Sequence, residues 1–376
     1  MTPVTDQATG KSAGAAFQPL PPTATIGILG GGQLGRMLAL AAARLGFDAC
    51  ILTPEEQAPA SRVAASCLVA AYDDPVALAE FAARCRVATF EFENVPARVV
   101  DRLRAAGVRM APGPLALATA QDRIAEKTFF RAVGVDCAPF AEIAAAAHIP
   151  EALARLGAPA LLKTRREGYD GKGQSWVRAP GDADAAFAAI GAAPAILEGR
   201  VDFVRELSVI AARGWSGEIA AYPLAENTHE NGVLRRSVAP ARVSDATAAQ
   251  ALDIASRLLV GLDYVGVMGV ELFEMADGRL LVNEIAPRVH NTGHWTLDAC
   301  QVDQFEQHIR AIAGWPLGPT RPFARAEMTN LLGDEADAWA VYAADPQARL
   351  WLYGKAEATP GRKMGHVNRL TGALPE

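Results

Sequence analysis

The sequence predicts an α/β domain at the N-terminus, followed by an α+β region and a small C-terminal module. Strands and helices alternate along residues 24–118, which is typical of a parallel sheet covered by helices. Farther along, the run Glu206-Leu207-Ser208-Val209-Ile210 alternates polar and apolar side chains, as strands of an antiparallel sheet do. After Gly314-Trp315-Pro316 the chain becomes rich in turns and short strands. A chain of 376 residues can bury the cores of two or three such domains.

The expected organisation has four parts. Residues 1–23 form a disordered tail, because Thr, Gly, Ala and Pro dominate there and the apolar core of a signal peptide is missing. A Rossmann-like domain follows at 24–118. The α+β region spans 119–315, and the C-terminal module spans 316–376.

Composition narrows the class of protein. The formal net charge of -6 and a pI of about 5.6 argue against a nucleic-acid partner, which would favour a basic chain. No apolar run approaches the roughly 18 residues of a membrane span. The five cysteines form no CxxC pair, which favours a reducing compartment.

A glycine-rich turn follows the first predicted strand. Gly30, Gly32 and Gly35 match the GxGxxG pattern of dinucleotide-binding folds. That function also needs an acidic residue where the second strand ends, but this strand ends Ile51-Leu52-Thr53-Pro54, and Glu55 and Glu56 lie beyond the proline. NAD is therefore not expected. Another phosphate at the helix N-terminus, or glycines that serve tight packing alone, both stay open.

A second glycine loop follows Lys163, which ends an apolar strand. The loop Arg166–Gln174 reads REGYDGKGQ, and another predicted strand comes directly after it. Strand, loop and strand indicate a β-hairpin lid rather than a Walker A loop, which would open a helix. Lys163 could reach nucleotide phosphates and the loop N–H groups could cover them. Asp170 does not fit this interpretation, because it would repel phosphate.

Two glutamates interrupt apolar strands on either side of a tight turn. Glu271 and Glu284 flank Asp277-Gly278, which predicts a hairpin that places both carboxylates side by side. Two Mg²⁺ ions that bridge nucleotide phosphates would relieve their repulsion. The alternative is a pair of exposed edge-strand glutamates, which the apolar neighbours Val270 and Ile285 disfavour.

Three weaker patterns remain. The segment Ile196–Val201, with Glu206 on the next strand, resembles an adenine slot with a ribose ligand. His290 and His294 lie four residues apart, but Pro287 and Gly293 indicate a loop, so a polar substrate loop is favoured over zinc. Lys355 and Arg362 could bind phosphate or simply form a solvated charge cluster.

Lys163, the glycine lid, the adenine pattern and the paired glutamates together resemble the ATP-grasp superfamily. Four segments are similar to the N5-carboxyaminoimidazole ribonucleotide synthetase family. They are GGGQLGRML at 30–38, KTRREGYDGKGQ at 163–174, NEIAPRVHNTGHWT at 283–296 and PGRKMGHVN at 360–368. The resemblance implies an ATP-grasp fold with a pre-ATP-grasp N-terminal domain and a mobile β-rich lid at about 139–202.

The resemblance also implies a reaction. ATP would phosphorylate bicarbonate to carboxyphosphate, and the amine of 5-aminoimidazole ribonucleotide would then be carboxylated to give the N5-carboxy product in purine biosynthesis. It implies two Mg²⁺ ions, no NAD, no biotin, no nucleic-acid or membrane partner, and a cytoplasmic homodimer.

Site residues follow from the same resemblance. The nucleotide ligands would be Arg123, Lys163, Gly168, Tyr169, Asp170, Gly171, Lys172, Gly173, Gln174, Glu198, Gly199, Arg200, Val201, Glu206, His229, Asn283 and Glu284. The ribonucleotide ligands would be Gly32, Gln33, Leu34, Tyr169, Asp170, Arg288, His290, Asn291, Lys355 and Arg362. Glu271 and Glu284 would bind metal, and the catalytic residues would be Asp170, Lys172 and Arg288.

The lid then has two faces. Gly171-Lys172-Gly173 would cover the ATP phosphates, while Tyr169 and Asp170 would face the ribonucleotide. Asp170 would orient the amine or act as its general base, and the sequence leaves both open. Three rival functions are kept: a formate-using ribonucleotide transformylase of the same superfamily, an NAD(P)-dependent oxidoreductase, and a nucleotide-binding protein without catalysis.

Overall fold

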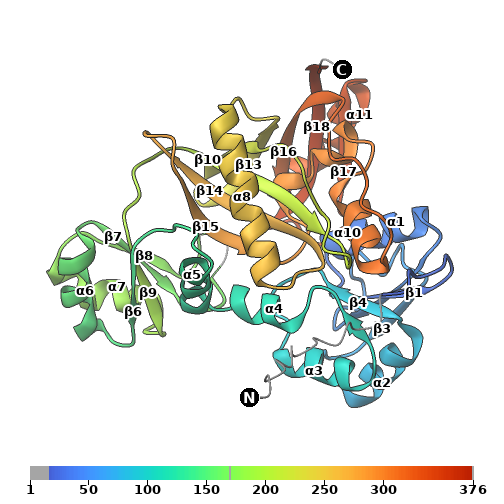
Figure 1. Cartoon of the computed structure of the whole chain (residues 1–376), viewed down its shortest axis with the longest axis horizontal. Helices are drawn as coiled ribbons and strands as arrows, with labels where there is room; N and C mark the ends of the chain where they lie inside the picture. Colours follow the sequence, from blue (N-terminus) through green and yellow to red (C-terminus); the bar gives the residue numbers. More distant parts are fainter. Residues whose placement is uncertain (1–16, 169–170, 375–376) are drawn as a thin grey trace, which may run out of the picture.

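The computed structural model describes residues 17–168 and 171–374 (Figure 1). The N-terminal domain is a parallel sheet in the order β3–β2–β1–β4–β5. Its strands are β1 (Thr25–Leu29), β2 (Asp48–Thr53), β3 (Ser66–Val69), β4 (Val87–Phe90) and β5 (Arg109–Met110). Its helices are α1 (Gln33–Arg44), α2 (Pro75–Arg84) and α3 (Ala97–Ala105). The predicted alternation of strands and helices is confirmed. Helix α1 begins three residues earlier than expected, so Gln33 and Leu34 lie in its first turn.

Two helices connect this domain to the rest of the chain. They are α4 (Pro114–Ala120) and α5 (Arg123–Ala132). Asp122 caps α5, because its carboxylate accepts hydrogen bonds from the N–H groups of Ile124 and Ala125 at 3.1 and 3.3 Å. This cap fixes the start of α5 and hence the position of Arg123, the first residue of the helix.

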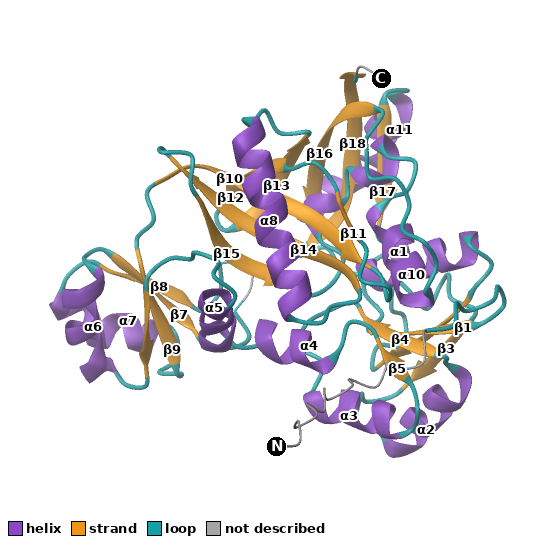
Figure 2. Cartoon of the chain, in the orientation of Figure 1, coloured by secondary structure: helices purple, strands orange, loops and turns teal. Residues whose placement is uncertain are grey.

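The predicted lid is an antiparallel sheet that projects from one side of the molecule (Figures 1 and 2). Its order is β6–β9–β7–β8. The bounds are β6 (Phe140–Ile143), β7 (Ala160–Thr164), β8 (Gln174–Val177) and β9 (Ala195–Gly199), with α6 (Ile149–Leu156) and α7 (Ala183–Ala189) packed against them. β7 and β8 pair in the register Lys163↔Gln174, which confirms the hairpin expected around the glycine loop.

The largest sheet runs in the order β15–β14–β10–β12–β13–β16–β18–β17, with β11 paired to β10. Its first strands are β10 (Phe203–Arg213), β11 (Ile219–Ala221), β12 (Ala225–Glu230), β13 (Val233–Ala239), β14 (Gly266–Met275) and β15 (Leu280–Ala286). Alternate residues of β10 enter two different cores, as strand geometry requires. Leu207 and Val209 pack with α8 (Asp245–Gly261), whereas Ile210 packs with α10 (Gln304–Ala313).

The C-terminal segment extends this same sheet. Its elements are β16 (Ala324–Leu332), α11 (Trp339–Ala344), β17 (Ala348–Leu352) and β18 (Lys363–Ala373), preceded by the short helix α9 (Thr296–Ala299). β13 pairs with β16 in the register Ser237↔Met328. Hydrogen bonds therefore join the predicted small module to the preceding region, although β16 and β18 are longer than the short strands expected there.

The predicted disordered tail is wrong for residues 17–23, while residues 1–16 lie outside the described residues. Leu20 donates its N–H to the carbonyl of Ala313 at 2.8 Å, and its own carbonyl accepts from Trp315 Nε1 at 2.8 Å. Phe17 stacks on Trp215 with ring centroids 4.5 Å apart. Phe17 and Leu20 therefore attach this segment to the folded domains. The composition of the segment, which is dominated by small residues, gave no indication of these contacts.

None of the helices in the described part of the chain is long and apolar enough to cross a membrane.

Candidate active site

A cavity of about 860 Å³ lies where the N-terminal domain, the lid, the large sheet and the C-terminal segment meet. Most of the predicted ligands line it although they come from distant parts of the sequence. They are Gln33, Leu34, Arg123, Lys163, Gly168, Gly171, Lys172, Gly173, Gln174, Glu206, His229, Glu271, Asn283, Glu284, Arg288, His290, Asn291, Lys355 and Arg362. Among the described residues, the predicted ligands outside this lining are Gly32, Glu198, Gly199, Arg200 and Val201. Tyr169 and Asp170 lie outside the described residues.

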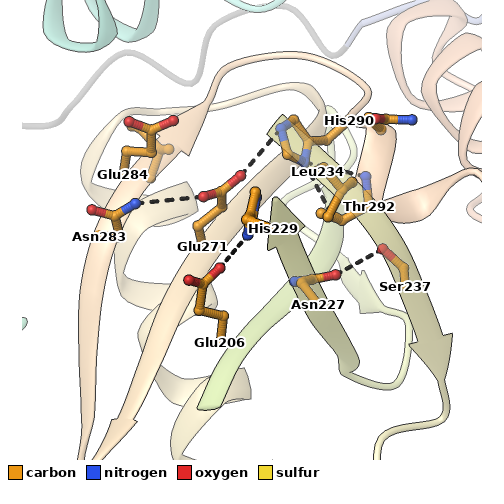
Figure 3. Close-up of polar contacts among 12 residues, drawn as sticks. Glu206, Asn227, His229, Leu234, Ser237, Glu271, Asn283, Glu284, His290 and Thr292 are labelled. Carbon is orange, nitrogen blue, oxygen red and sulfur yellow. Dashed lines mark hydrogen bonds and ion pairs between the residues drawn. The ribbon is translucent and has the colours of Figure 1, made fainter. Parts of the chain in front are cut away.

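The paired glutamates line the cavity from two neighbouring strands (Figure 3). Glu271 on β14 lies opposite Glu284 on β15, which confirms the predicted juxtaposition. The register shifts immediately afterwards, because Leu272 pairs with Val282 and leaves Asn283 as an extra residue. Such a bulge redirects a side chain. Here it places the Asn283 amide 3.5 Å from Glu271 Oε2, so three oxygen-bearing side chains lie together in the cavity lining.

The two carboxylates differ in charge state. Burial and the nearby negative charge of Glu284 raise the pKa of Glu271 to about 7. Burial also acts against ionisation of Glu284, but the guanidinium of Arg123, 3.0 Å from its Oε2, outweighs burial and lowers the pKa of Glu284. The helix cap on Asp122 thus positions the cation that keeps Glu284 ionised.

This donor set fits Mg²⁺ only when a phosphate shares the coordination. Within the described ranges, no group of three His, Cys, Asp or Glu side chains is placed to hold a metal by itself. Two carboxylates and one amide are hard oxygen donors of the kind that hold Mg²⁺ together with substrate phosphates. The raised pKa of Glu271 indicates that a cation there would relieve the repulsion between the two carboxylates.

A polar pair lies beside the glutamates on the neighbouring strands (Figure 3). Glu206 on β10 contacts Nδ1 of His229 on β12. Burial lowers the pKa of His229, but the hydrogen bond to Glu206 outweighs it and raises that pKa overall. The pair therefore keeps one carboxylate and one imidazole at fixed positions on the cavity wall.

The side-chain carboxylate of Glu91 caps the N-terminus of α1, where a bound anion would otherwise lie. The N–H groups of Gly32 and Gly35 donate to Glu91 Oε1 and Oε2 at 2.5 and 2.9 Å. A Cβ at Gly32 would lie 2.6 Å from Glu91 Oε1, so the glycine pattern has a packing reason. These N–H groups are the ones that a bound phosphate would use. The arrangement argues against a dinucleotide or any phosphate at this turn, while Gln33 and Leu34 face the cavity.

A second acidic residue of the same loop connects the N-terminal domain to the large sheet. Glu93 Oε2 accepts a hydrogen bond from Arg288 Nε at 2.5 Å, and Arg288 Nη1 also donates to the carbonyl of Val289 at 3.1 Å. Burial acts to raise the pKa of Glu93, but the charge of Arg288 outweighs it and lowers that pKa. The ion pair fixes the guanidinium of Arg288 where the two domains meet.

Buried side-chain amides hydrogen-bond to the loop that follows β15. Gln304 on α10 accepts from the N–H of His290 at 2.9 Å and donates to its carbonyl at 2.7 Å. The same amide lies 3.0 Å from Nδ1 of His294. Asn291 and Asn330 exchange hydrogen bonds between their side-chain amides at 3.0 and 2.7 Å. These contacts make both histidines parts of an ordered loop, and the predicted substrate role of this loop stays a prediction.

The electrostatics of this loop keep His290 neutral. Burial and the charge of Arg288 lower the pKa of His290 to about 3. Its Nε2 lies 3.5 Å from Glu271 Oε1, so a neutral ring stands beside the paired glutamates (Figure 3).

Part of the cavity lining is cationic. Lys355, Arg362 and Lys363 all belong to it. Burial and the charge of Arg362 lower the pKa of Lys355 to about 8, and its Nζ donates to the carbonyl of Lys363 at 2.8 Å. A bound anion would offset this mutual repulsion, which favours a phosphate site over an ordinary solvated cluster.

Three families match consecutive parts of the chain. The ribonucleotide synthetase preATP-grasp domain matches residues 23–121, the ATP-grasp domain 128–305, and the phosphoribosylaminoimidazole carboxylase C-terminal domain 326–374. An N5-carboxyaminoimidazole ribonucleotide synthase of Brucella melitensis is 52% identical over 353 residues, which cover 93% of this chain and 97% of the relative. The chain belongs to the N5-carboxyaminoimidazole ribonucleotide synthase family.

Other relatives and solved structures agree with this family. The synthase of Bacillus subtilis is 41% identical over 350 residues, which cover 92% of this chain and 91% of that protein. An ADP complex of an N5-carboxyaminoimidazole ribonucleotide synthetase matches with a TM-score of 0.90 at 42% identity, covering 94% of both chains. The Aspergillus clavatus enzyme, in complex with ADP and 5-aminoimidazole ribonucleotide, matches at 0.87 and 30% identity, covering 94% and 95%. The ATP-grasp fold expected for this family is confirmed, and the exact domain boundaries stay predictions.

Sequence reasoning assigned no role to several residues that shape the site, although it predicted that the loop Glu91–Asn94 carries part of a site. Glu91 and Glu93 lie in a loop that the strand order marks as a site loop, because it follows a parallel strand at the sheet's carboxyl edge. Their partners, Gly32 and Arg288, could not be inferred from spacing, since 59 and 195 residues separate them. The burial of Lys127 on α5 was not predicted either, because nothing in an amphipathic helix pattern distinguishes a buried lysine from an exposed one.

Proposed function

We propose that this chain is the ATP-dependent ligase that carboxylates 5-aminoimidazole ribonucleotide with bicarbonate, in the purine pathway of its relatives. The observation that carries the proposal is one cavity lined by both an acidic and a cationic group of side chains. The first group is the carboxylates Glu271 and Glu284 with Arg123 and Lys163, and the second is Lys355 with Arg362. The first group suits a metal-bound triphosphate and the second suits the 5′-phosphate of a ribonucleotide.

The proposed reaction begins with bicarbonate attacking the γ-phosphorus of ATP, which releases ADP and forms carboxyphosphate. Lys163 and Arg123 would bind phosphate oxygens, and Gly171-Lys172-Gly173 of the lid would cover them. Bound Mg²⁺, held by Glu271, Glu284 and Asn283, would neutralise the phosphate charge. The ribonucleotide amine then attacks the carboxyl carbon, phosphate leaves, and loss of a proton from the nitrogen gives the carbamate.

The second substrate would lie between the N-terminal domain and the large sheet. Gln33 and Leu34 would contact it from α1, and Arg288 would face the reacting carboxyl group. His290, neutral because of its low pKa, can accept or donate one hydrogen bond without adding charge. Asp170 is proposed to orient the amine, and its position lies outside the described residues. Two Mg²⁺ ions, a homodimer and a cytoplasmic location are proposed on family resemblance.

One assay separates this function from its rivals. Phosphate release from Mg-ATP is measured with and without 5-aminoimidazole ribonucleotide, and with bicarbonate or formate as the acid. We expect release that requires both the ribonucleotide and bicarbonate. Stimulation by formate would favour the transformylase, and release that ignores both substrates would contradict the proposal. The names of the relatives and the Glu91 cap already argue against the transformylase and the NAD-dependent oxidoreductase.

A further inference from the structure

Lys127 is a nearly fully buried lysine on α5 that lies behind the cavity. Its side chain is 1% exposed. Nζ donates a hydrogen bond to the carbonyl of Asn283 at 2.6 Å and lies 3.4 Å from Glu198 Oε1. The ammonium group therefore links β15, which carries Glu284, to β9 of the lid.

Glu198 stands between two lysines. Its Oε2 accepts a hydrogen bond from Lys163 Nζ at 2.7 Å, while Oε1 makes no hydrogen bond within the described residues. Burial acts to raise the pKa of Glu198, but Lys163 and Lys127 outweigh it and lower that pKa to about 2. The carboxylate is thus ionised at neutral pH, and in this structure Lys163 is its direct partner.

In the proposed function, Lys163 binds phosphate oxygens of ATP rather than Glu198. To bind phosphate, its Nζ must leave Glu198, and a buried carboxylate left without a counter-ion is strongly destabilised. Lys127 removes that obstacle. Its Nζ needs to move only a few tenths of an ångström, about 0.3 Å, to reach ordinary hydrogen-bond distance from the vacant Oε1.

We propose that Lys127 is a positioning residue of the nucleotide site: it is the permanent counter-ion of Glu198 and so releases Lys163 to the phosphates. This inference rests on the ATP-binding part of the proposed function. It requires that Lys127 act through Lys163, without touching the nucleotide. Loss of Lys127 should therefore trap Lys163 on Glu198.

The test is Lys127→Met, assayed by calorimetric binding of Mg-ATP and by the KM values of both substrates. We expect Mg-ATP binding to weaken at least about tenfold, equivalent to 1.4 kcal/mol, with the ribonucleotide KM changed less than about twofold. Arg131→Met is the matched control, since Arg131 is an exposed cation one turn farther along the same helix. Unchanged Mg-ATP binding in Lys127→Met, or equal losses for both substrates, would overturn the proposal.

A second comparison distinguishes the counter-ion role of Lys127 from a general loss of stability. It also covers the case in which Lys127→Met does not fold. In a Glu198→Gln background Lys163 is already released, so adding Lys127→Met should change Mg-ATP binding less than about twofold. The double variant also removes both charges of the buried Lys127–Glu198 pair, which favours its folding. A tenfold effect of Lys127→Met in that background would refute the counter-ion role.

The binding measurement needs no ribonucleotide, so it stays separate from the carboxylation assay. If the wild-type protein binds Mg-ATP but releases phosphate independently of ribonucleotide and bicarbonate, the proposed reaction fails and the Lys127 result still stands. If the wild-type protein does not bind Mg-ATP, both fail together.

Discussion

Metal-dependent nucleotide binding should weaken on acidification because Glu271 holds a proton up to about neutral pH. The pKa of Glu271 is raised to about 7 by burial and by Glu284. A cation binds the ionised carboxylate, so it must displace this proton, and affinity must rise with pH. With a pKa of 7 the carboxylate is about 90% ionised at pH 8 and about 10% at pH 6. Mg-ADP binding should therefore weaken roughly tenfold over that interval, or about 1.4 kcal/mol.

The assay is calorimetric titration with Mg-ADP at pH 6, 7 and 8 and constant ionic strength. Glu271→Gln should bind more weakly and lose the part of the pH dependence that the protein contributes. Protonation of the nucleotide itself is common to every variant and cancels in this comparison. Glu126→Gln is the matched control, because burial raises the pKa of Glu126 to about 8 while its carboxylate accepts from the N–H of Ile285 behind the site. A wild-type profile parallel to that of Glu271→Gln would refute the reasoning.

Three further outcomes follow from the same geometry. Glu284→Gln should abolish turnover by weakening metal binding, and near-normal turnover at low Mg²⁺ would contradict this. Gln304→Glu loses the donor to the His290 carbonyl, so the ribonucleotide KM should rise about tenfold while Mg-ATP binding, measured separately, stays within twofold. Asp170→Asn should damage ribonucleotide-dependent turnover more than ATP affinity, and equal loss of both would make it a loop-shaping residue.

The elements that the sequence predicted best are those whose signal is local. The hairpin around Asp277-Gly278 placed Glu271 opposite Glu284, because turn chemistry and strand alternation fix the register of neighbouring strands. The hairpin after Lys163 was predicted for the same reason. The bulge that redirects Asn283 was not, since a single extra residue leaves no mark in an alternating pattern.

Contacts between domains could not be predicted in this way. The prediction of a disordered tail was wrong at Phe17. Its ring stacks on Trp215 and lies 4.5 Å from the guanidinium of Arg109. These partners lie about 200 and 90 residues away, so composition within the segment carries no information about them. The family resemblance supplied the ligand set across such distances, but it did not supply Glu91, Glu93 or Gln304, which act on other residues rather than on the ligands.

The GxGxxG turn shows why local patterns mislead at such contacts. A glycine-rich turn before a helix creates unpaired N–H groups that attract an anion, whatever its source. In this chain the anion is Glu91, which accepts from the N–H groups of Gly32 and Gly35, and the next acidic residue, Glu93, pairs with Arg288. One short loop thus supplies hydrogen-bond acceptors to the helix N-terminus and fixes the guanidinium of Arg288. If Arg288 contacts the ribonucleotide as proposed, the motif serves that substrate indirectly, by anchoring the loop that positions Arg288.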